Sequence, residues 1–99
     1  MKRGEVYPYP KFDRYFLIVS TQHLTDAGTV IVVEVAEQAP EGTRGMLTVS
    51  LEDDGVPMSV LCWRVNYMQA ERLGPERAHT LSERAMAHVE MALRTAMDL

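Results

Sequence analysis

Hydrophobic residues along the first two thirds of the chain fall in short runs separated by turn-forming residues. Residues 15–20 and 29–35 are rich in β-branched and aromatic side chains, which is typical of strands buried on both faces. Residues 46–51 alternate in hydropathy with a period of two, as a half-buried strand does. Residues 60–68 form a last run of the same kind. The pattern predicts a sheet of several short strands.

The residues between these runs predict tight connections. Pro8 and Pro10 follow a short run at residues 5–7, and we expect them to end that strand because proline has no N–H for a central ladder. Residues 25–28 and 53–55 are rich in Asp and Gly, which favour turns. Strands spanning about residues 4–68 with such connections predict a strongly bent sheet or a small barrel.

The end of the chain changes to a helical period. Hydrophobic residues recur at three- and four-residue spacing over about residues 81–98, which predicts one amphipathic helix. Thr80 and Glu83 fit a capping box at its start. The methionine-rich stripe is expected to pack on the core, or to form a protein-binding face, and the two roles are compatible in a homodimer. With no linker or repeat in view, residues 1–99 are expected to form one domain.

Composition narrows the class of protein. With Cys62 as the single cysteine, one chain cannot build a disulfide or a cysteine-based zinc site, and a small buried side chain is the simplest role for it. The longest apolar stretches are about five residues, far short of the roughly 20 needed to span a membrane. No signal-peptide core is recognised at the N-terminus. We therefore expect a cytoplasmic protein that does not bind membranes.

The net charge of −4 is unevenly distributed. Residues 26–54 carry seven carboxylates and one arginine, whereas residues 1–14 carry four basic and two acidic side chains. The acidic balance argues against a general nucleic-acid coat, but it leaves room for a local basic site.

Candidate chemistry is sparse. The sequence has no glycine-rich phosphate loop, no paired metal ligands and no nucleophile elbow, so neither metal nor cofactor is predicted. Arg14 stands immediately before a buried strand, where its guanidinium group can bind a phosphate through two hydrogen bonds. The alternative for Arg14 is an ion pair with Asp13 or with a carboxylate of residues 26–54, the acidic middle segment.

Several short motifs resemble those of the MazF/PemK toxins. Residues 3–7 read Arg-Gly-Glu-Val-Tyr, and residues 14–20 follow with an arginine, an apolar strand and a serine, as in that family. The similarity continues through residues 29–35, 59–62 and 72–74 and so covers nearly the whole chain.

The resemblance implies a mainly β fold with a C-terminal helix, a small SH3-like barrel of the CcdB/PemK/MazF type. It also implies a homodimeric toxin of a type II toxin–antitoxin module, bound by a cognate antitoxin. MazF-like members cleave single-stranded RNA without a metal ion. Arg14 matches their catalytic arginine, which stabilises charge on the phosphate or protonates the leaving group.

The sequence departs from the family at other positions of that site. Ala36 stands where the family has a catalytic serine or threonine after the third strand, and Trp63 and Arg64 replace its usual Asp-Gln. We expect other side chains to take over: Glu37 as a carboxylate base, Arg64 as a second phosphate contact, Trp63 as a base-stacking residue, and Ser20 and Thr21 as hydrogen-bond donors to the substrate.

Three functions follow from the sequence. The first is a MazF-like endoribonuclease with an altered active site. The second is a toxin that binds DNA gyrase, because residues 6–15 are also similar to the gyrase poison CcdB, although residues 96–99 lack the tryptophan on which that poisoning depends. The third is a catalytically inactive family member that acts only by binding proteins.

Overall fold

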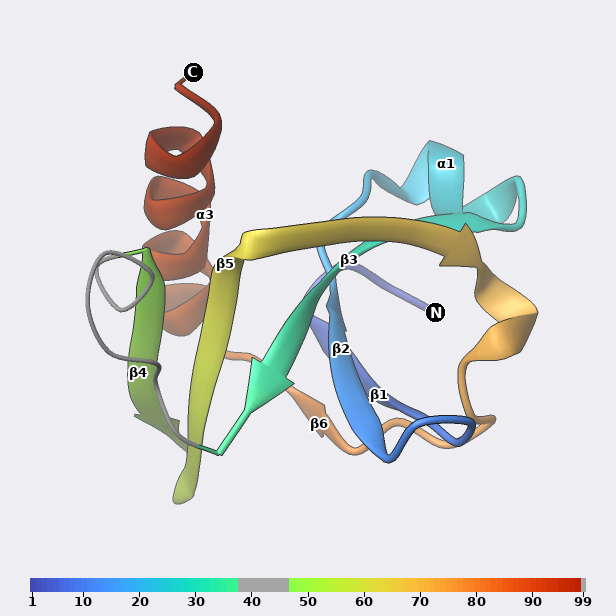
Figure 1. Cartoon of the computed structure of the whole chain (residues 1–99), viewed down its shortest axis with the longest axis horizontal. Helices are drawn as coiled ribbons and strands as arrows, with labels where there is room; N and C mark the ends of the chain where they lie inside the picture. Colours follow the sequence, from blue (N-terminus) through green and yellow to red (C-terminus); the bar gives the residue numbers. More distant parts are fainter. Residues whose placement is uncertain (38–46, 99) are drawn as a thin grey trace.

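A single sheet with a helix at the C-terminus organises the molecule (Figure 1). The structure, a computed structural model, describes residues 1–37 and 47–98. The strands are β1 (Glu5–Tyr9), β2 (Arg14–Ile18), β3 (Thr29–Ala36), β4 (Thr48–Asp53), β5 (Val56–Gln69) and β6 (His79–Thr80); the helices are α1 (Gln22–Asp26), the 3₁₀ turn η1 (Ala70–Arg72) and α3 (Glu83–Met97).

The sheet is antiparallel, runs in the order β4-β5-β3-β2-β1-β6 and curls into a half-barrel. Its curl depends on β5, which bends sharply between its two halves (Figure 1). The first half of β5 pairs with both β4 and β3, and the second half pairs with β3. On β3, Val33 faces Val65 while Glu34 faces Leu61, so β5 bulges between these two positions. Bulges bend a strand and increase its twist. The predicted mainly β fold with a C-terminal helix is confirmed.

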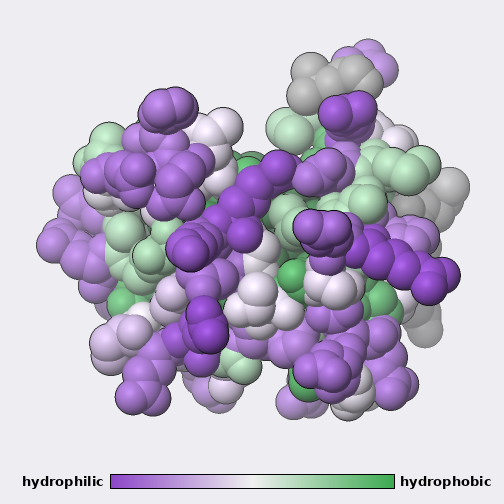
Figure 2. Space-filling view, turned by 180° about the vertical axis from the view of Figure 1, so that it is seen from behind, coloured by the Kyte–Doolittle hydropathy of each residue, from purple (hydrophilic) through white to green (hydrophobic). Residues whose placement is uncertain are grey.

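Each face of the curled sheet carries a hydrophobic cluster. One packs beneath α3 and contains Val6, Leu17, Val33, Val60 and Val89 among others. The second lies on the other face, where the segment after β5 folds back; its buried members are Tyr7, Phe16, Ile18, Val30, Val32 and Leu73. Figure 2 shows the molecule from behind the view of Figure 1. Hydrophilic residues cover most of the molecular surface on that side, and hydrophobic residues show in small patches between them.

The β4–β5 hairpin uses the turn predicted at residues 53–55. Asp53 pairs with Val56, which leaves Asp54 and Gly55 as a two-residue loop with φ of 52° and 78°. Two consecutive positive φ values are those of a type I′ turn, whose twist matches that of the strands. The strand before this turn was predicted at residues 46–51, and its first residue lies outside the described residues.

The prediction that β1 ends before Pro8 is wrong. The strand continues to Tyr9, and Pro8 pairs with Tyr15 of β2. The Pro8 carbonyl points away from β2 and accepts a hydrogen bond from the Gly74 N–H at 2.8 Å. Because the N and C=O of one residue point to the same side of an antiparallel strand, the missing Pro8 N–H costs no bond to β2.

Gly74 is required by this close approach. A Cβ at Gly74 would lie 2.8 Å from Cγ of Pro8, whose ring cannot swing aside. We expect Gly74→Ala to lower the free energy of unfolding by about 1–3 kcal/mol through overpacking. Urea titration checks this, and an unchanged midpoint would show that the segment after β5 packs on β1 differently.

The start of the C-terminal helix also differs from the prediction. Thr80 is not its N-cap, because Thr80 pairs with Glu5 in the β6–β1 ladder. Ser82 caps α3 instead and accepts a hydrogen bond from the Ala85 N–H at 3.2 Å. The short helix α1 was not predicted, since its polar residues resemble a turn. No helix of the described ranges is long and apolar enough to span a membrane.

Cys62 lies fully buried on β5, as its place in a hydrophobic run predicts. Burial raises the pKa of its thiol to about 11, because the thiolate is poorly solvated there. We expect the native chain at pH 8 to react with a thiol reagent such as DTNB at least 100-fold more slowly than the urea-unfolded chain. Equal rates would contradict the burial of this side chain.

Candidate functional site

Three charged side chains meet on neighbouring strands at one end of the second cluster. Glu34 projects from β3, between Arg14 of β2 and Arg64 of β5. Arg14 Nε lies 3.4 Å from Glu34 Oε1, and Arg64 Nη1 lies 3.0 Å from Glu34 Oε2. The bulge in β5 falls between Leu61 and Val65 and therefore sets the position of Arg64. We call Arg14, Glu34 and Arg64 the arginine cluster.

The burial of the arginine cluster is asymmetric. The Glu34 side chain is 10% exposed, whereas those of Arg14 and Arg64 are 44% and 48% exposed. Within the described part of the chain Glu34 Oε2 accepts no hydrogen bond. Its contact with Arg64 Nη1 is therefore an ion pair without hydrogen-bond geometry. Each guanidinium group has five N–H donors in a planar fork, more than one carboxylate can accept. With two cations and one anion, the cluster can bind an anionic group from solvent.

The alternative for Arg14 that the sequence left open is therefore realised in part. Arg14 does pair with a carboxylate of the acidic middle segment, and that carboxylate is Glu34. The same carboxylate pairs with Arg64, the predicted second phosphate contact. An ion pair and a phosphate site are compatible here, because one buried carboxylate holds two half-exposed guanidinium groups.

The loop before Arg14 adds an aromatic residue to this end of the sheet. Phe12 is 58% exposed, and its ring centroid lies 5.5 Å from Lys11 Nζ and 6.0 Å from Arg14 Cζ. The Tyr9 ring packs at a tilt against Phe12, with 5.6 Å between centroids. The loop and the arginine cluster thus form one continuous surface of cationic and aromatic side chains.

Ala36, which stands at the family's serine or threonine position, is the last residue of β3. Tyr15 pairs with Val35, so extending the register by one residue sets Arg14 opposite Ala36. Ala36 brings no hydroxyl, and its neighbour on β5 is Ser59, which is buried and hydrogen-bonded to Ser50.

Glu37 is the residue that follows β3. Together with Tyr15, Val35 and His79, it lines a cavity of about 260 Å³ at the open end of the first cluster. Side chains alternate between the faces of a strand, so Val35 and Glu34 point to opposite faces. Ala36 lines the same cavity, and the role of Glu37 as a base stays a prediction.

Ser20 and Thr21 lie beyond the other end of β2. Five residues lie between Arg14, the first residue of β2, and Ser20, and β2 itself, which ends at Ile18, spans about 13 Å from its first to its last residue. Ser20 is buried, and its Oγ lies 2.9 Å from Thr25 Oγ1. Thr21 is exposed at the N-cap of α1. These hydroxyls are outside the arginine cluster, and their contact with a substrate stays a prediction.

Trp63 is half-buried next to Arg64. Its indole N–H donates a hydrogen bond to Thr48 Oγ1 at 3.1 Å, which ties β5 to β4. That bond gives Trp63 a structural role, and stacking on a base stays a prediction.

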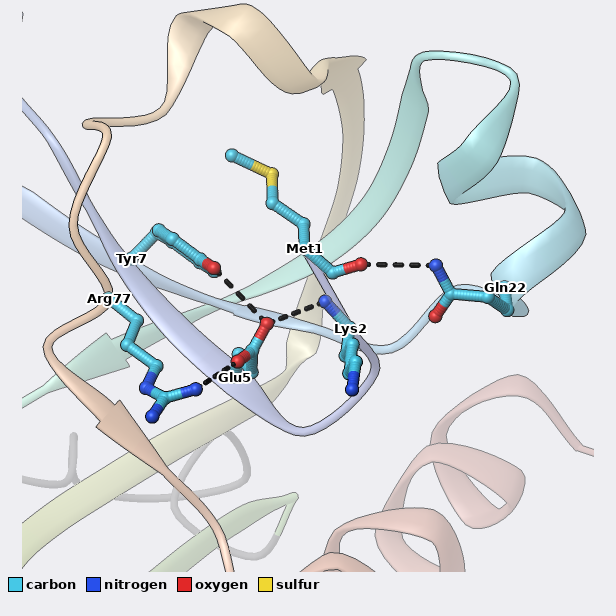
Figure 3. A network of polar contacts seen from close by, with 6 residues as sticks. All are labelled: Met1, Lys2, Glu5, Tyr7, Gln22 and Arg77. Atoms are coloured by element: carbon cyan, nitrogen blue, oxygen red, sulfur yellow. Dashed lines mark hydrogen bonds and ion pairs between the residues drawn. The ribbon is translucent and has the colours of Figure 1, made fainter.

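A second buried carboxylate serves the fold rather than this site (Figure 3). Glu5 accepts hydrogen bonds from the Lys2 N–H at 2.6 Å, the Tyr7 hydroxyl at 3.1 Å and Arg77 Nη1 at 2.8 Å. Burial alone would raise the pKa of Glu5, but these bonds, led by that of Arg77, hold it below its usual range. Burial and the bond to Glu5 raise the pKa of Tyr7.

Asp53 forms the other polar junction. It accepts hydrogen bonds from the Ser82 hydroxyl at 2.7 Å and the Ser82 N–H at 3.0 Å, and its Oδ2 lies 2.9 Å from His79 Nε2. The bonds from Ser82 and then His79 lower the pKa of Asp53 despite its burial. This junction joins β4, β6 and the start of α3. Within residues 1–37 and 47–98, no three His, Cys, Asp or Glu side chains gather as a possible metal site.

Two residues of the site escaped the sequence analysis. Glu34 was read as part of a hydrophobic strand, although a single carboxylate inside such a run signals a buried ion pair. Phe12 was not singled out, although it stands between the basic residues Lys11 and Arg14, and single-strand nucleic-acid sites combine aromatic and basic side chains.

Comparison with known proteins places this geometry in context. A family model described as "PemK-like, MazF-like toxin of type II toxin-antitoxin system" matches residues 3–97. No significant sequence match was found among proteins of curated function.

Solved structures share the fold over the whole chain. An endoribonuclease from a mycobacterial species superposes with a TM-score of 0.86 at 21% identity, covering 100% of this chain and 92% of that one. A mycobacterial endoribonuclease in complex with its cognate antitoxin gives 0.85 at 19%, covering 100% and 96%. MazF in a MazE–MazF complex from Deinococcus radiodurans gives 0.79 at 16%, covering 100% and 96%.

Proposed function

The chain belongs to the PemK-like, MazF-like family of toxins of type II toxin–antitoxin systems, and from this premise we propose that it is a metal-independent endoribonuclease that cleaves single-stranded RNA. The family resemblance predicted from the sequence is confirmed. The observation that carries the proposal is the arginine cluster, in which Arg14 and Arg64 present half-exposed guanidinium groups around Glu34.

The reaction matches what such a cluster can stabilise. The ribose 2′-oxygen attacks the adjacent phosphorus, the bond from phosphorus to the 5′-oxygen breaks, and a 2′,3′-cyclic phosphate and a 5′-hydroxyl remain. The proton of the 2′-hydroxyl passes to a base, and the leaving 5′-oxygen gains one from an acid. Negative charge grows on the phosphoryl oxygens in the transition state, and fixed cationic donors stabilise it most strongly there.

In this proposal the two arginines share the phosphate. A guanidinium group keeps its proton at any physiological pH, so we assign Arg14 to charge stabilisation rather than to protonation of the leaving group. Arg64 makes the second phosphate contact. Glu34 positions both side chains, because its carboxylate is buried and fixed on β3 between them. The proton acceptor is open: Ala36 provides no hydroxyl, and Glu37 remains the predicted base.

The family also implies partners. Two of the neighbouring structures are complexes with antitoxins, and we propose that a cognate antitoxin binds this chain and neutralises it. We further propose a homodimer acting in the cytoplasm. Co-expression with the antitoxin gene, expected next to this one, should restore growth, and co-purification should yield a stable complex.

Inducible expression followed by mapping of cellular RNA 5′ ends tests the proposed function. We expect growth arrest and new 5′ ends that share a short sequence, and neither effect with Arg14→Ala. Growth arrest without new RNA ends would refute the nuclease. Protein-dependent double-strand breaks in a gyrase supercoiling reaction would then support the toxin that binds DNA gyrase. The absence of such breaks would support the inactive family member that acts only by binding proteins.

A further inference from the structure

We propose that Glu34 is the proton acceptor for the ribose 2′-hydroxyl, a role beyond its positioning of the two arginines. The inference deepens the proposed function and rests on it for the reaction. It assigns the open role of base to a residue of β3 that the sequence motifs do not single out.

The first support is a buried carboxylate oxygen without a hydrogen-bond donor. Three carboxylates are buried within the described residues: Glu5, Glu34 and Asp53. Both oxygens of Glu5 and both oxygens of Asp53 accept hydrogen bonds, as carboxylates that serve the fold do. Glu34 Oε2 accepts none from the described residues. Folded proteins rarely leave a buried acceptor without a donor, because that acceptor has lost its bonds to water. The hydroxyl of a bound ribose would supply the donor that Glu34 lacks.

The second support is the position of Glu34 beside the phosphate site. Its carboxylate lies 3.4 Å from Arg14 Nε and 3.0 Å from Arg64 Nη1, and these are the two side chains assigned to the phosphate. In a geometry ready for attack, the 2′-oxygen stands about 3–3.5 Å from the phosphorus. The base for that oxygen therefore has to lie next to the groups that hold the phosphate, as Glu34 does.

The third support is the face of the sheet from which Glu34 projects. Glu34 and Ala36 are two residues apart on β3, so their side chains leave the same face. Phe16 of β2 pairs with Glu34, and Arg14 shares the face of Phe16 for the same reason. The carboxylate thus lies on the face where Ala36 provides no hydroxyl, two residues further into the strand.

Arg64 controls access to the unbonded oxygen. Glu34 Oε2 is buried, and its contact with Arg64 is an ion pair without hydrogen-bond geometry. The Arg64 side chain is 48% exposed, and ion pairs at that exposure hold weakly. When Arg64 turns to a bound phosphate, Oε2 is uncovered. The 2′-hydroxyl then gives its proton to Oε2 while the 2′-oxygen bonds to phosphorus. The bond from phosphorus to the 5′-oxygen breaks, and water protonates that oxygen.

Separate measurements of cleavage and of binding test this role. Glu34→Gln keeps the size of the side chain but cannot take the proton, so single-turnover cleavage should slow about 100- to 10,000-fold. A fluorescein-labelled 2′-O-methyl RNA has no 2′-proton to lose. The Glu34→Gln chain should bind it at least as tightly as the unmodified chain does, because one negative charge is gone from beside the arginines. Glu90→Gln is the matched control: the Glu90 side chain is 38% exposed and pairs with Arg3, so cleavage should be unchanged.

A second variant separates the loss of the base from damage to the site. Glu34→Ala leaves a space where the carboxylate was, and sodium formate should restore part of its cleavage because formate brings back an acceptor. Sodium chloride at the same concentration should restore none, and formate should leave Glu34→Gln slow because the amide fills that space.

The outcomes distinguish this role from the proposed function. Cleavage by Glu34→Gln at the unmodified rate would overturn the role of Glu34 and leave Glu37 as the predicted base of the nuclease. Equal losses of cleavage and of binding would also overturn it, since a side chain that only positions the arginines gives that result. So would a Glu34→Ala chain that binds the probe but gains nothing from formate. If the unmodified chain cleaves no RNA, the proposed function is refuted, and this role with it.

Discussion

Replacing Arg14 with alanine is expected to lower the rate of RNA cleavage about 100- to 1,000-fold while leaving the fold intact. The loss of rate follows from removing one fixed donor to the charged phosphoryl group in the transition state, which costs about 2.7–4 kcal/mol in comparable sites. The fold should survive because Arg14 is 44% exposed, and half-exposed ion pairs contribute at most about 1 kcal/mol. Single-turnover cleavage of a labelled RNA gives the rate.

Two further variants sharpen this measurement. Arg3→Ala is the matched control: Arg3 is 43% exposed and pairs with Glu90 at 2.9 Å, outside the arginine cluster, so cleavage should be unchanged. Arg14→Lys keeps the charge but loses the planar fork and should recover only part of the rate. A rate for Arg14→Ala within threefold of the unmodified chain would remove Arg14 from the reaction.

Replacing Asp53 with alanine should give the largest loss of stability among single substitutions at the polar junctions. Asp53 accepts two hydrogen bonds from Ser82 and pairs with His79, so its loss removes three polar contacts and leaves the His79 ring, which is 13% exposed, without this carboxylate. We expect a cost of about 3–4 kcal/mol, against a total of about 5–15 kcal/mol for a typical domain. In thermal unfolding, the midpoint should fall by roughly 12–32 °C.

Acid titration gives the same junction a second test. The folded pKa of Asp53 is lowered, so its contribution is complete above the unfolded pKa of about 4 and disappears as the pH falls through the folded value. Asp53→Asn should therefore be destabilised at pH 7 yet lose less stability than the unmodified chain on further acidification. Asp54→Asn is the control, because Asn suits the positive φ of 52° in the hairpin turn. Parallel acid curves for the Asp53 variant and the unmodified chain would contradict the assigned bonds.

The sequence predicts the fold well where periodicity and turn chemistry agree. The strand runs, the Asp54-Gly55 turn and the C-terminal helix follow from local patterns that tertiary contacts reinforce. The errors occur where a distant residue decides: Pro8 stays in its strand because its carbonyl bonds to Gly74, and Ser82 rather than Thr80 caps α3 because β6 occupies Thr80. Such pairings join segments far apart in the chain and leave no periodic signal.

The candidate site was predictable only in part, for the same reason. Arg14 and Arg64 were both named as phosphate contacts, but nothing local shows that one buried carboxylate, Glu34, joins them across β2, β3 and β5. The β5 bulge that sets Arg64 appears only in the strand register. Ser20 was chosen for its polarity beside a strand, whereas the structure uses its hydroxyl to bond Thr25.

The most direct test of the central claim is cleavage of a defined RNA by the purified chain, freed of any antitoxin, with identification of the product ends. We predict a 2′,3′-cyclic phosphate and a 5′-hydroxyl without added metal ions, the same products formed about 100- to 1,000-fold more slowly by Arg14→Ala, and resistance when a single 2′-deoxy nucleotide precedes the cleaved bond. Cleavage that continues through that 2′-deoxy position, or no cleavage across a pool of randomised RNA sequences, would contradict the account.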